Sequence, residues 1–226
     1  MKSLDILYED NHLLAINKAS GMLVQGDETG DTPLVEEVKE YIKDRYEKPG
    51  AVFLGVVHRL DRPVSGVVVF ARTSKALSRM NELFRDRKTE KIYWAITDSK
   101  PMEREGTLVH WLSKDEKKNK TTAYKRDTPD TLKSELHYKV IGSSGGNCLL
   151  EVHPITGRSH QIRVQLSAMG CPIVGDVKYG STAETGDGSI ALHARRLTFV
   201  HPVRKESLTL EAKLPDRSWW MAFKNI

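Results

Sequence analysis

The chain has 226 residues, of which 39% are hydrophobic and 29% are charged, a composition typical of a soluble globular protein. No apolar run approaches the roughly 18–20 residues that cross a bilayer, and the N-terminus lacks the apolar core of a signal peptide, so we expect a cytoplasmic protein without membrane attachment. Cys148 and Cys171 form no CxxC pair, which indicates two buried thiols rather than a disulfide. The formal net charge of +5 and the pI near 9.1 favour a polyanionic partner without requiring one.

The chain opens with two short apolar runs, Ile6–Tyr8 and Leu13–Ile16, which the turn-forming pair Asp10-Asn11 separates. This pattern predicts a β-hairpin. Further on, Thr32 followed by Pro33 is a typical helix start, a capping residue and then a first-turn proline. Apolar residues recur at helical spacing after this pair, so we expect a helix there.

A polar turn lies between two apolar runs in the stretch from Val56 to Thr73. Short unbroken apolar runs bounded by glycine and proline predict strands that are covered on both faces. The turn between these strands carries a single acid, Asp61, which stands between Arg59 and Arg62. A carboxylate on such rigid elements is a natural place for chemistry.

A second amphipathic helix is expected to begin at Thr73 or Ser74, which are both good capping residues. The segment KIYWAIT predicts a strand, and the turn SSGGN between apolar stretches predicts a second hairpin. Between them, positions 113–126 are basic and polar; we interpret them as a solvated loop, with an RNA-facing loop as the alternative. A third helix is expected with Ser159 as its cap and Gly170 at its end, and strands and the aromatic segment SWWMAF close the chain.

The order of these elements shows hairpins and helices without a regular βαβ repeat. It predicts an α+β fold with a largely antiparallel, mixed β-sheet core and flanking helices. The sequence has no internal repeat, low-complexity tract or long linker, so we expect one domain over residues 1–226. It also has no heptad pattern or exposed apolar stripe, and we expect a monomer.

Polar residues gather again between Gly157 and Arg163, where the third predicted helix begins without an acid. A helix N-terminus with two arginines is a ready site for an anion such as phosphate. Arg163 lies about one turn beyond Ser159 and can point into the protein, whereas Arg158 can face solvent. A buried Arg163 needs a carboxylate partner, and Asp61 is the candidate that we choose.

Histidines and aspartates could suggest a metal site. The candidates are His58, His153, His160, His193 and His201, with Asp61 and Asp176. None of them has a recognised ligand spacing such as HExxH, and scattered histidines are usually satisfied structural residues. We therefore expect no metal.

Four segments, in the same order, carry a resemblance to a known family. They are INKASGMLV, HRLDRPVSG, KIYWAI, and PITGRSHQIRVQLSAMGCPIVGDVKYG followed by LHARRLTFVHP. Together they resemble the signatures of the RluA-type RNA pseudouridine synthases, although Ala19 stands where proline is usual and Val64 where threonine is usual. The similarity covers nearly the whole chain and implies that family's catalytic-domain fold. The first motif begins almost at residue 1, so the chain resembles the compact members that lack an N-terminal S4 domain.

The resemblance implies isomerisation of uridine to pseudouridine within rRNA or tRNA, without a cofactor, because the reaction transfers no net hydride or electron. Asp61 corresponds to the family's essential aspartate, which either attacks the nucleotide covalently or takes a proton from the ribose; both routes stay open. Arg163 matches the basic residue that pairs with this aspartate and keeps it ionised. Tyr93 matches the tyrosine that stacks on the target base, and its hydroxyl is a candidate for removing the C5 proton.

The resemblance also implies how RNA is held. The target nucleotide must leave the helix, because C1′ and the base faces are inaccessible in a stacked duplex. Arg59 matches the arginine that fills the vacated space, and we expect Ile162 to pack on the uracil ring opposite Tyr93. The other expected RNA contacts are Arg158, His160, Arg62, Lys18 and the lysines of 113–126.

Two other interpretations compete with an RNA-modifying isomerase. One is a non-catalytic RNA-binding or ribosome-assembly factor on the same fold; a carboxylate such as Asp61 argues against it, because it repels a polyanion. The other is a metal-dependent phosphodiesterase that uses the histidines and Asp176, which activity in a strong chelator would exclude. We rank the isomerase first.

Overall fold

The computed structural model describes residues 4–224 and residue 226. The chain folds into two compact units: unit 1 comprises Met1–Glu90 and Ala194–Lys213, and unit 2 comprises Lys91–His193 and Leu214–Ile226. Each unit contains a sheet and helices, so the predicted α+β class is confirmed. The single domain over residues 1–226 stays a prediction. None of the helices in the described residues is long and apolar enough to cross a membrane.

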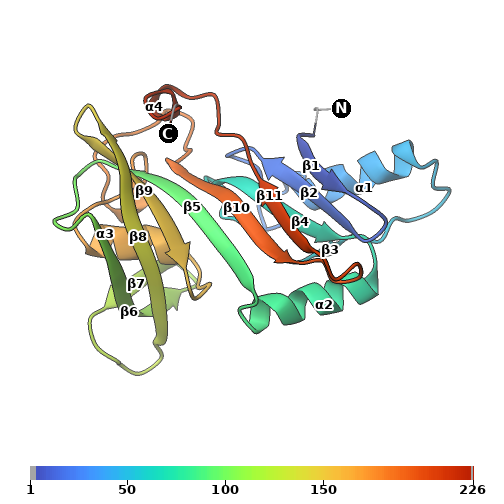
Figure 1. The fold of residues 1–226 in the computed structure, drawn as a ribbon, viewed down its shortest axis with the longest axis horizontal. Coiled ribbons are helices and arrows are strands. Elements are labelled where there is room, and N and C mark those ends of the chain that lie inside the picture. Colours follow the sequence, from blue (N-terminus) through green and yellow to red (C-terminus); the bar gives the residue numbers. More distant parts are fainter. Residues whose placement is uncertain (1–3, 225) are drawn as a thin grey trace. The chain divides into compact units, whose positions relative to one another are not determined.

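The sheet of unit 1 has the order β1-β2-β4-β10, with β3 beside β4 and β11 beside β10 (Figure 1). Its strands are β1 (Ile6–Glu9), β2 (Leu13–Lys18), β3 (Gly55–Val56), β4 (Ser65–Ala71), β10 (Leu192–Val200) and β11 (Ser207–Glu211). The predicted N-terminal hairpin is confirmed, because β1 pairs antiparallel with β2. The Asp10 carboxylate closes its turn by accepting hydrogen bonds from the N–H groups of His12 (2.7 Å) and Leu13 (2.8 Å).

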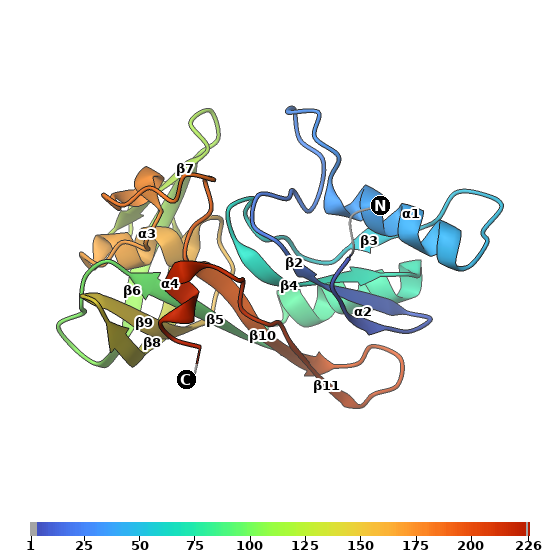
Figure 2. The same ribbon diagram turned by 90° about the horizontal axis from the view of Figure 1, so that it is seen from above.

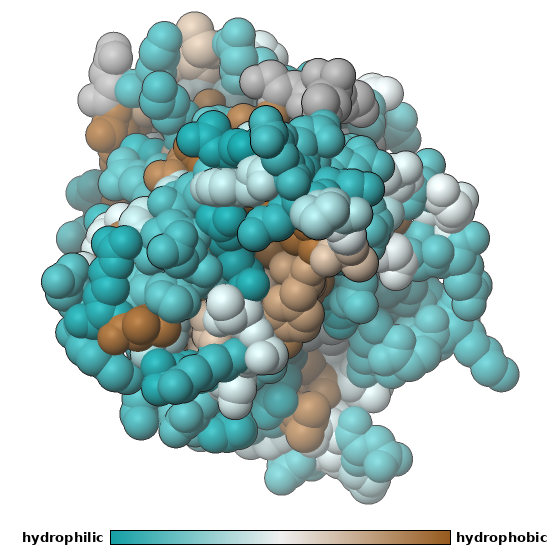
Figure 3. Space-filling view, turned by 90° about the vertical axis from the view of Figure 1, so that its right-hand side faces the viewer, coloured by the Kyte–Doolittle hydropathy of each residue, from teal (hydrophilic) through white to brown (hydrophobic). Residues whose placement is uncertain are grey.

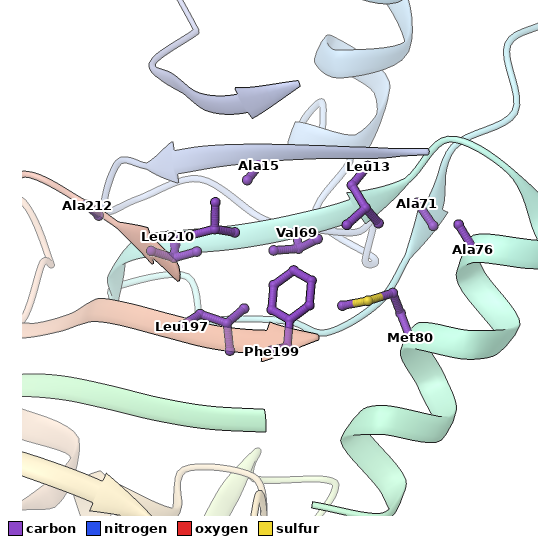
Figure 4. Packing of buried hydrophobic residues seen from close by; sticks show 11 residues of the cluster. Leu13, Ala15, Val69, Ala71, Ala76, Met80, Leu197, Phe199, Leu210 and Ala212 are labelled. Atoms are coloured by element: carbon purple, nitrogen blue, oxygen red, sulfur yellow. The ribbon is translucent and has the colours of Figure 1, made fainter. Parts of the chain in front are cut away.

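One face of this sheet is a hydrophobic core that follows the two-residue period of the strands (Figure 4). Its buried members are Leu13, Ala15, Val67, Val69, Ala71, Ala76, Met80, Leu197, Phe199, Leu210 and Ala212. The alternate residues, such as Leu14 and Phe70, are also buried and point to the other face. β4 is therefore covered on both faces, as its unbroken apolar sequence predicts.

The helix α1 (Leu34–Arg45) packs on the face of the sheet opposite to that core. Tyr41 and Tyr46, on and just after α1, donate hydrogen bonds to the Glu9 carboxylate at 2.9 and 2.8 Å, and Glu9 pairs in register with Leu14. The predicted start of α1 is one residue off. Pro33, in an extended conformation, is the N-cap in place of Thr32, and it forms no side-chain cap because its ring carries no acceptor.

The helix α2 (Ser74–Arg85) covers the core face with Ala76 and Met80 (Figure 4). Its predicted cap is confirmed: the Thr73 hydroxyl accepts a hydrogen bond from the Ala76 N–H at 3.1 Å. On the side of the molecule where α1 and α2 lie, the surface is mostly hydrophilic, with hydrophobic colour confined to small areas (Figure 3). Both helices thus turn their apolar faces inward.

The sheet of unit 2 has the order β5-β9-β8-β6-β7. Its strands are β5 (Thr89–Thr97), β6 (Glu105–Asp115), β7 (Lys120–Tyr124), β8 (Leu132–Ser144) and β9 (Asn147–Pro154). The predicted hairpin across SSGGN is confirmed, and both of its central residues, Gly145 and Gly146, have positive φ angles (57° and 86°). Cys148 and Cys171 are buried free thiols, as predicted.

The basic stretch 113–126 is a β-hairpin, so its interpretation as a loop is wrong. β6 and β7 pair antiparallel across it, from Trp111 with Tyr124 to Asp115 with Lys120. Thr121 is buried while its charged neighbours are exposed. The sequence hides this strand because its lysines face solvent and only one or two small side chains point inward.

The helix α3 (Gln161–Ala168) packs against β6, β7 and the short 3₁₀ helix η1 (Val177–Tyr179) (Figure 2). Its predicted cap is wrong: His160, in the left-handed conformation with φ 53°, precedes the helix in place of Ser159. Gly170, also at positive φ, follows its end as predicted. The last helix, α4 (Ser218–Met221), buries Trp220 edge-on against His193.

Candidate active site

The turn in HRLDRPVSG leads directly into β4, all of whose residues are buried. Leu60 and Val64 are also buried, and they anchor the turn in unit 1. A hydrogen bond from the Val64 N–H to the Asp61 carbonyl (3.0 Å) closes it. Asp61 is partly exposed between these anchors, and Arg59 is exposed. The turn therefore presents a carboxylate from a backbone that is held on both sides.

Gly66, at the start of β4, permits a close approach of two backbones. Its φ angle is +117°, and a Cβ atom there would lie 2.6 Å from the backbone nitrogen of Ala194. No residue with a side chain fits this position without moving backbone. The glycine of the motif thus lets β4 and the chain at Ala194 meet directly behind the turn.

A buried ammonium group lies beneath the turn. Lys18, at the end of β2, is only 1% exposed. Its Nζ donates hydrogen bonds to the carbonyls of Ala19 (3.0 Å), Met22 (2.9 Å) and Arg62 (3.3 Å). One cation therefore ties the segment after β2 to the turn that carries Asp61.

Burial lowers the pKa of Lys18 to about 7, and the neighbouring Asp61 carboxylate opposes this shift while Arg62 adds to it. The burial of Lys18 was not predicted, because a lysine inside a short polar segment is most often exposed. The RNA contact predicted for this residue stays a prediction.

Arg62 adds a second link between the same two segments. Its backbone carbonyl accepts from the Gly21 N–H at 2.8 Å, and its Nε donates to the Gly21 carbonyl at 3.0 Å. Its Nη2 lies 2.6 Å from the Asp31 carboxylate. This arginine is exposed at the surface next to Asp61, and the RNA contact predicted for it stays a prediction.

His58 is held by a backbone donor. The Val69 N–H donates to His58 Nε2 at 3.1 Å, so Nε2 is unprotonated and the neutral ring carries its hydrogen on Nδ1. The ring also stacks on Phe84 of α2, with centroids 4.9 Å apart. His58 therefore joins the turn to β4 and α2, which is a structural role.

In unit 2, Arg163 is buried on α3, as its spacing predicts. Its Nε and Nη2 donate to the two carboxylate oxygens of Asp176 at 2.7 and 2.9 Å, which is a bidentate pair. The predicted need for a buried carboxylate is thus met by Asp176, a residue that sequence reasoning missed as a partner. The further pairing of Arg163 with Asp61 stays a prediction.

The segment before α3 is shaped by Gln161. Its Oε1 accepts from the Thr156 hydroxyl (2.7 Å) and from the Arg158 N–H (3.0 Å), and its Nε2 donates to the Glu135 carbonyl (3.0 Å). Arg158 itself is exposed, as predicted. The buried amide therefore fixes the backbone from which Arg158 reaches solvent.

His160 is placed differently from the prediction. It is buried, and its Nδ1 lies 2.7 Å from the Tyr179 hydroxyl. The phosphate contact predicted for His160 stays a prediction. The Tyr179 hydroxyl also accepts from the Thr121 N–H at 2.8 Å, so η1, β7 and the start of α3 meet at one atom.

The two residues predicted to face the base lie on different elements of unit 2. Tyr93 is half-buried on β5, where it pairs in register with Val152 of β9. Ile162 is buried on α3. Their packing on a uracil ring stays a prediction.

The described residues contain no group of three or more His, Cys, Asp or Glu side chains that could together hold a metal ion. Asp176, a candidate ligand in the sequence, is committed to Arg163. His201 lies 3.1 Å from the Asp10 carboxylate at the far end of β10. These candidates are structural partners of other side chains.

The sequence profile of the family described as RNA pseudouridylate synthase matches residues 12–168. The chain belongs to this family. The match contains the Asp61 turn, Tyr93 and Arg163, and the resemblance seen in the four motifs is confirmed. Asp176 and Tyr179 lie beyond the matched residues.

Curated family members align along most of the chain. The ribosomal large subunit pseudouridine synthase C of Vibrio cholerae is 32% identical over 92% of this chain and 65% of its own length. The tRNA pseudouridine synthase C of Vibrio parahaemolyticus is 34% identical over 97% of this chain and 94% of its own length. The chain thus spans about two thirds of the first relative and nearly all of the second.

Solved structures of the family share the fold. Human RNA pseudouridylate synthase domain containing 4 superposes with a TM-score of 0.78 at 29% identity, covering 93% of this chain and 88% of that chain. Human RNA pseudouridylate synthase domain containing 1 superposes with a TM-score of 0.72 at 23% identity and 95% coverage of this chain, which supports the fold alone.

Proposed function

We propose that this protein isomerises specific uridines to pseudouridine in structured RNA, with Asp61 as the reacting carboxylate. The observation that carries the proposal is the family's HRLD turn, complete in this chain and anchored by Leu60, Val64 and the buried Lys18. A protein that only bound RNA would have no use for a carboxylate held at this position, because a negative charge repels phosphate.

The proposed reaction balances without a cofactor. The N1–C1′ bond of the uridine breaks, the freed uracil turns over, C5 bonds to C1′, and C5 loses a proton while N1 gains one. Asp61 either attacks the nucleotide and forms a covalent intermediate or removes a ribose proton, and both routes need the carboxylate ionised. The product is an isomer of the substrate, so no redox partner is required.

Two residues of unit 2 take part in this proposal. Arg163 is the cation that stabilises the Asp61 carboxylate, and the bidentate pair with Asp176 orients its guanidinium. Tyr93 stacks on the target base and removes the C5 proton late in the reaction. A tyrosine suits both tasks, since it combines an aromatic face with a hydroxyl.

RNA binding follows from the exposed cations. Arg59, next to Asp61, fills the stack that the flipped uridine leaves, and Ile162 packs on the uracil opposite Tyr93. Arg62, Arg158 and the lysines of the β6–β7 hairpin contact phosphates, which position the RNA without specifying its sequence. The relatives are named for rRNA and for tRNA, and both are candidate substrates.

The experiment measures tritium release from RNA labelled at uridine C5, prepared from cells that lack the protein. Asp61→Asn removes the carboxylate but keeps its size, so we expect tritium release to fall by more than about 1000-fold while the protein still binds RNA. The matched control is Asp44→Asn on the exposed side of α1, which removes the same charge and should keep the release rate.

Each result decides between the candidate functions. Release by the parent and by Asp44→Asn, but not by Asp61→Asn, supports the isomerase. Full release by purified Asp61→Asn would refute the role of Asp61. RNA binding by the parent without release from either rRNA or tRNA would support a non-catalytic RNA-binding factor instead.

A further inference from the structure

The Tyr179 side chain joins three parts of unit 2. It accepts a hydrogen bond from the Thr121 N–H of β7 at 2.8 Å and lies 2.7 Å from Nδ1 of His160, the residue before α3. The Tyr179 ring faces the Arg163 guanidinium, whose central carbon is 5.0 Å from the ring centroid. A single side chain thus touches the basic hairpin, the start of α3 and the buried arginine.

The Thr121 N–H can only donate, so the phenol oxygen accepts there, whereas the direction of the hydrogen bond with His160 Nδ1 depends on the tautomer of the histidine. Burial raises the pKa of Tyr179, so the phenol stays protonated at neutral pH. Loss of the hydroxyl would leave the buried Thr121 N–H and His160 Nδ1 without this partner.

Further contacts hold the hairpin to the same segments. The Thr121 hydroxyl donates to the Ser159 carbonyl at 3.0 Å, and Lys178 of η1 donates to the Asn119 carbonyl in the hairpin turn at 3.1 Å. The exposed cations of the hairpin and its end are Lys114, Lys117, Lys118, Lys120, Lys125 and Arg126. Only Asp115 and Glu116 oppose their charge within this segment. The hairpin is therefore a positively charged element that side-chain hydrogen bonds hold against η1 and the segment before α3.

We infer that Tyr179 is a positioning residue with two functions, and this inference rests on the proposed function. Its hydroxyl holds the basic β6–β7 hairpin in the orientation that contacts RNA phosphates. Its ring packs on Arg163 and, together with Asp176, holds the guanidinium for the reaction. Tyr179 lies outside the residues that the family profile matches, so the profile does not assign it this role.

Tyr179→Phe tests the first function, because it removes the hydroxyl and keeps the ring. The probe is a mixture of large-subunit rRNA and tRNA from cells that lack the protein. We expect RNA affinity to fall about tenfold near physiological salt, and the slope of log K against log salt to become shallower by about 1–2, since each lost phosphate contact contributes roughly 0.7–0.9. KM should rise by more than kcat falls.

Tyr179→Leu tests the second function, because it removes the ring as well. We expect kcat to fall at least about tenfold further than in Tyr179→Phe, since Arg163 loses its packing partner. Tyr138→Phe is the matched control: this tyrosine of β8 is equally buried, but its hydroxyl contacts the Glu103 carbonyl instead of the hairpin. It should change neither the salt slope nor kcat.

A double variant separates positioning from a general loss of stability. Lys117→Gln with Lys118→Gln removes two hairpin charges directly. If Tyr179 holds these charges against phosphate, adding Tyr179→Phe to this pair lowers affinity by less than the two effects multiplied. Full multiplicativity, or an unchanged salt slope in Tyr179→Phe, would overturn the inference.

Hydrogen exchange of the hairpin amides gives a readout that needs no activity. We expect the Thr121 amide to exchange faster in Tyr179→Phe than in the parent at equal overall stability. If the Thr121 amide exchanges at the same rate in Tyr179→Phe and in the parent, the inference is overturned. The proposed function still holds in that case, provided that the parent releases tritium. Faster exchange in Tyr179→Phe, together with no tritium release by the parent, would confirm that Tyr179 holds the hairpin and refute the isomerase.

Discussion

Replacing Lys18 with methionine tests whether the buried ammonium holds the active-site turn. Methionine fills a similar volume with a flexible apolar chain. It removes all three hydrogen bonds that Nζ donates, to the carbonyls of Ala19 (3.0 Å), Met22 (2.9 Å) and Arg62 (3.3 Å). The segment after β2 and the turn that carries Asp61 then lose the cation they share.

The size of the effect follows from these contacts. A hydrogen bond from a charged group contributes about 1.5–3 kcal/mol to stability. Part of the sum of the three hydrogen bonds offsets the cost of burying the ammonium, the same desolvation that lowers the pKa of Lys18 to about 7. A net loss of about 2–4 kcal/mol is expected, because three carbonyl oxygens lose a donor at once. For a chain of this length, the melting temperature should fall by about 5–15 °C.

Thermal unfolding followed by circular dichroism measures the loss of stability. Tritium release, assayed well below both melting temperatures, measures whether the turn still holds Asp61 in a reactive position. We expect release to slow in Lys18→Met, since Asp61 is less firmly held. The control is Lys39→Met on α1, which removes an exposed pair with Glu36 worth less than about 1 kcal/mol. If Lys18→Met melts and reacts like the parent, the ammonium does not hold the turn.

The same lysine predicts a pH dependence. Its pKa is about 7 in the folded chain and about 10.4 in an unfolded one, so between these values the unfolded chain binds more protons. The free energy of unfolding must then rise with pH in the parent relative to Lys18→Met, by about 2 kcal/mol between pH 7 and pH 9. Denaturant titrations at the two pH values measure this difference, and a difference that stays constant contradicts the lowered pKa.

Three other variants probe the frame of the site. Gly66→Ala forces a Cβ atom against the Ala194 backbone at a positive φ angle, so it should lower the free energy of unfolding by more than about 3 kcal/mol. A free energy of unfolding equal to that of the parent, measured by denaturant titration, would disprove the close approach. Asp176→Asn removes the bidentate carboxylate partner of the buried Arg163 and should cost about 3–5 kcal/mol in the same assay, whereas a loss below about 1 kcal/mol would mean that another group replaces it. Thr73→Ala removes the cap of α2 and should cost about 1 kcal/mol, seen as a melting temperature lower by about 2–4 °C with unchanged tritium release.

Helix and strand positions were predictable where local signals are strong. The Asp10 turn, the Thr73 cap and the buried strand β4 all follow from residues close together in the chain. The predictions failed where the signal is weak. Residues 113–126 form a hairpin whose inward positions are small, and His160 precedes α3 in a left-handed conformation that Ser159 would not reveal.

The exposure or burial of the candidate site residues was also predictable for some of them and not for others. The exposure of Arg59 and Arg158 and the burial of Arg163 follow from their positions on a turn or one helical turn from a cap. The burial of Lys18 and His160 was not predicted, and their assignment to RNA contact stays a prediction. Charge or polarity in a sequence indicates affinity for phosphate only when the fold leaves the group at the surface.

The sequence by itself determined the family, the α+β class and the turn that carries Asp61, because each is written in residues that are neighbours along the chain. Only the tertiary structure decided which partners hold the site. Lys18 and the Arg62 carbonyl are 44 positions apart, Arg163 and Asp176 are 13 apart, and Thr121 and Tyr179 are 58 apart. A buried polar group must find a partner wherever the fold brings one, and neither periodicity nor spacing in the sequence specifies that meeting.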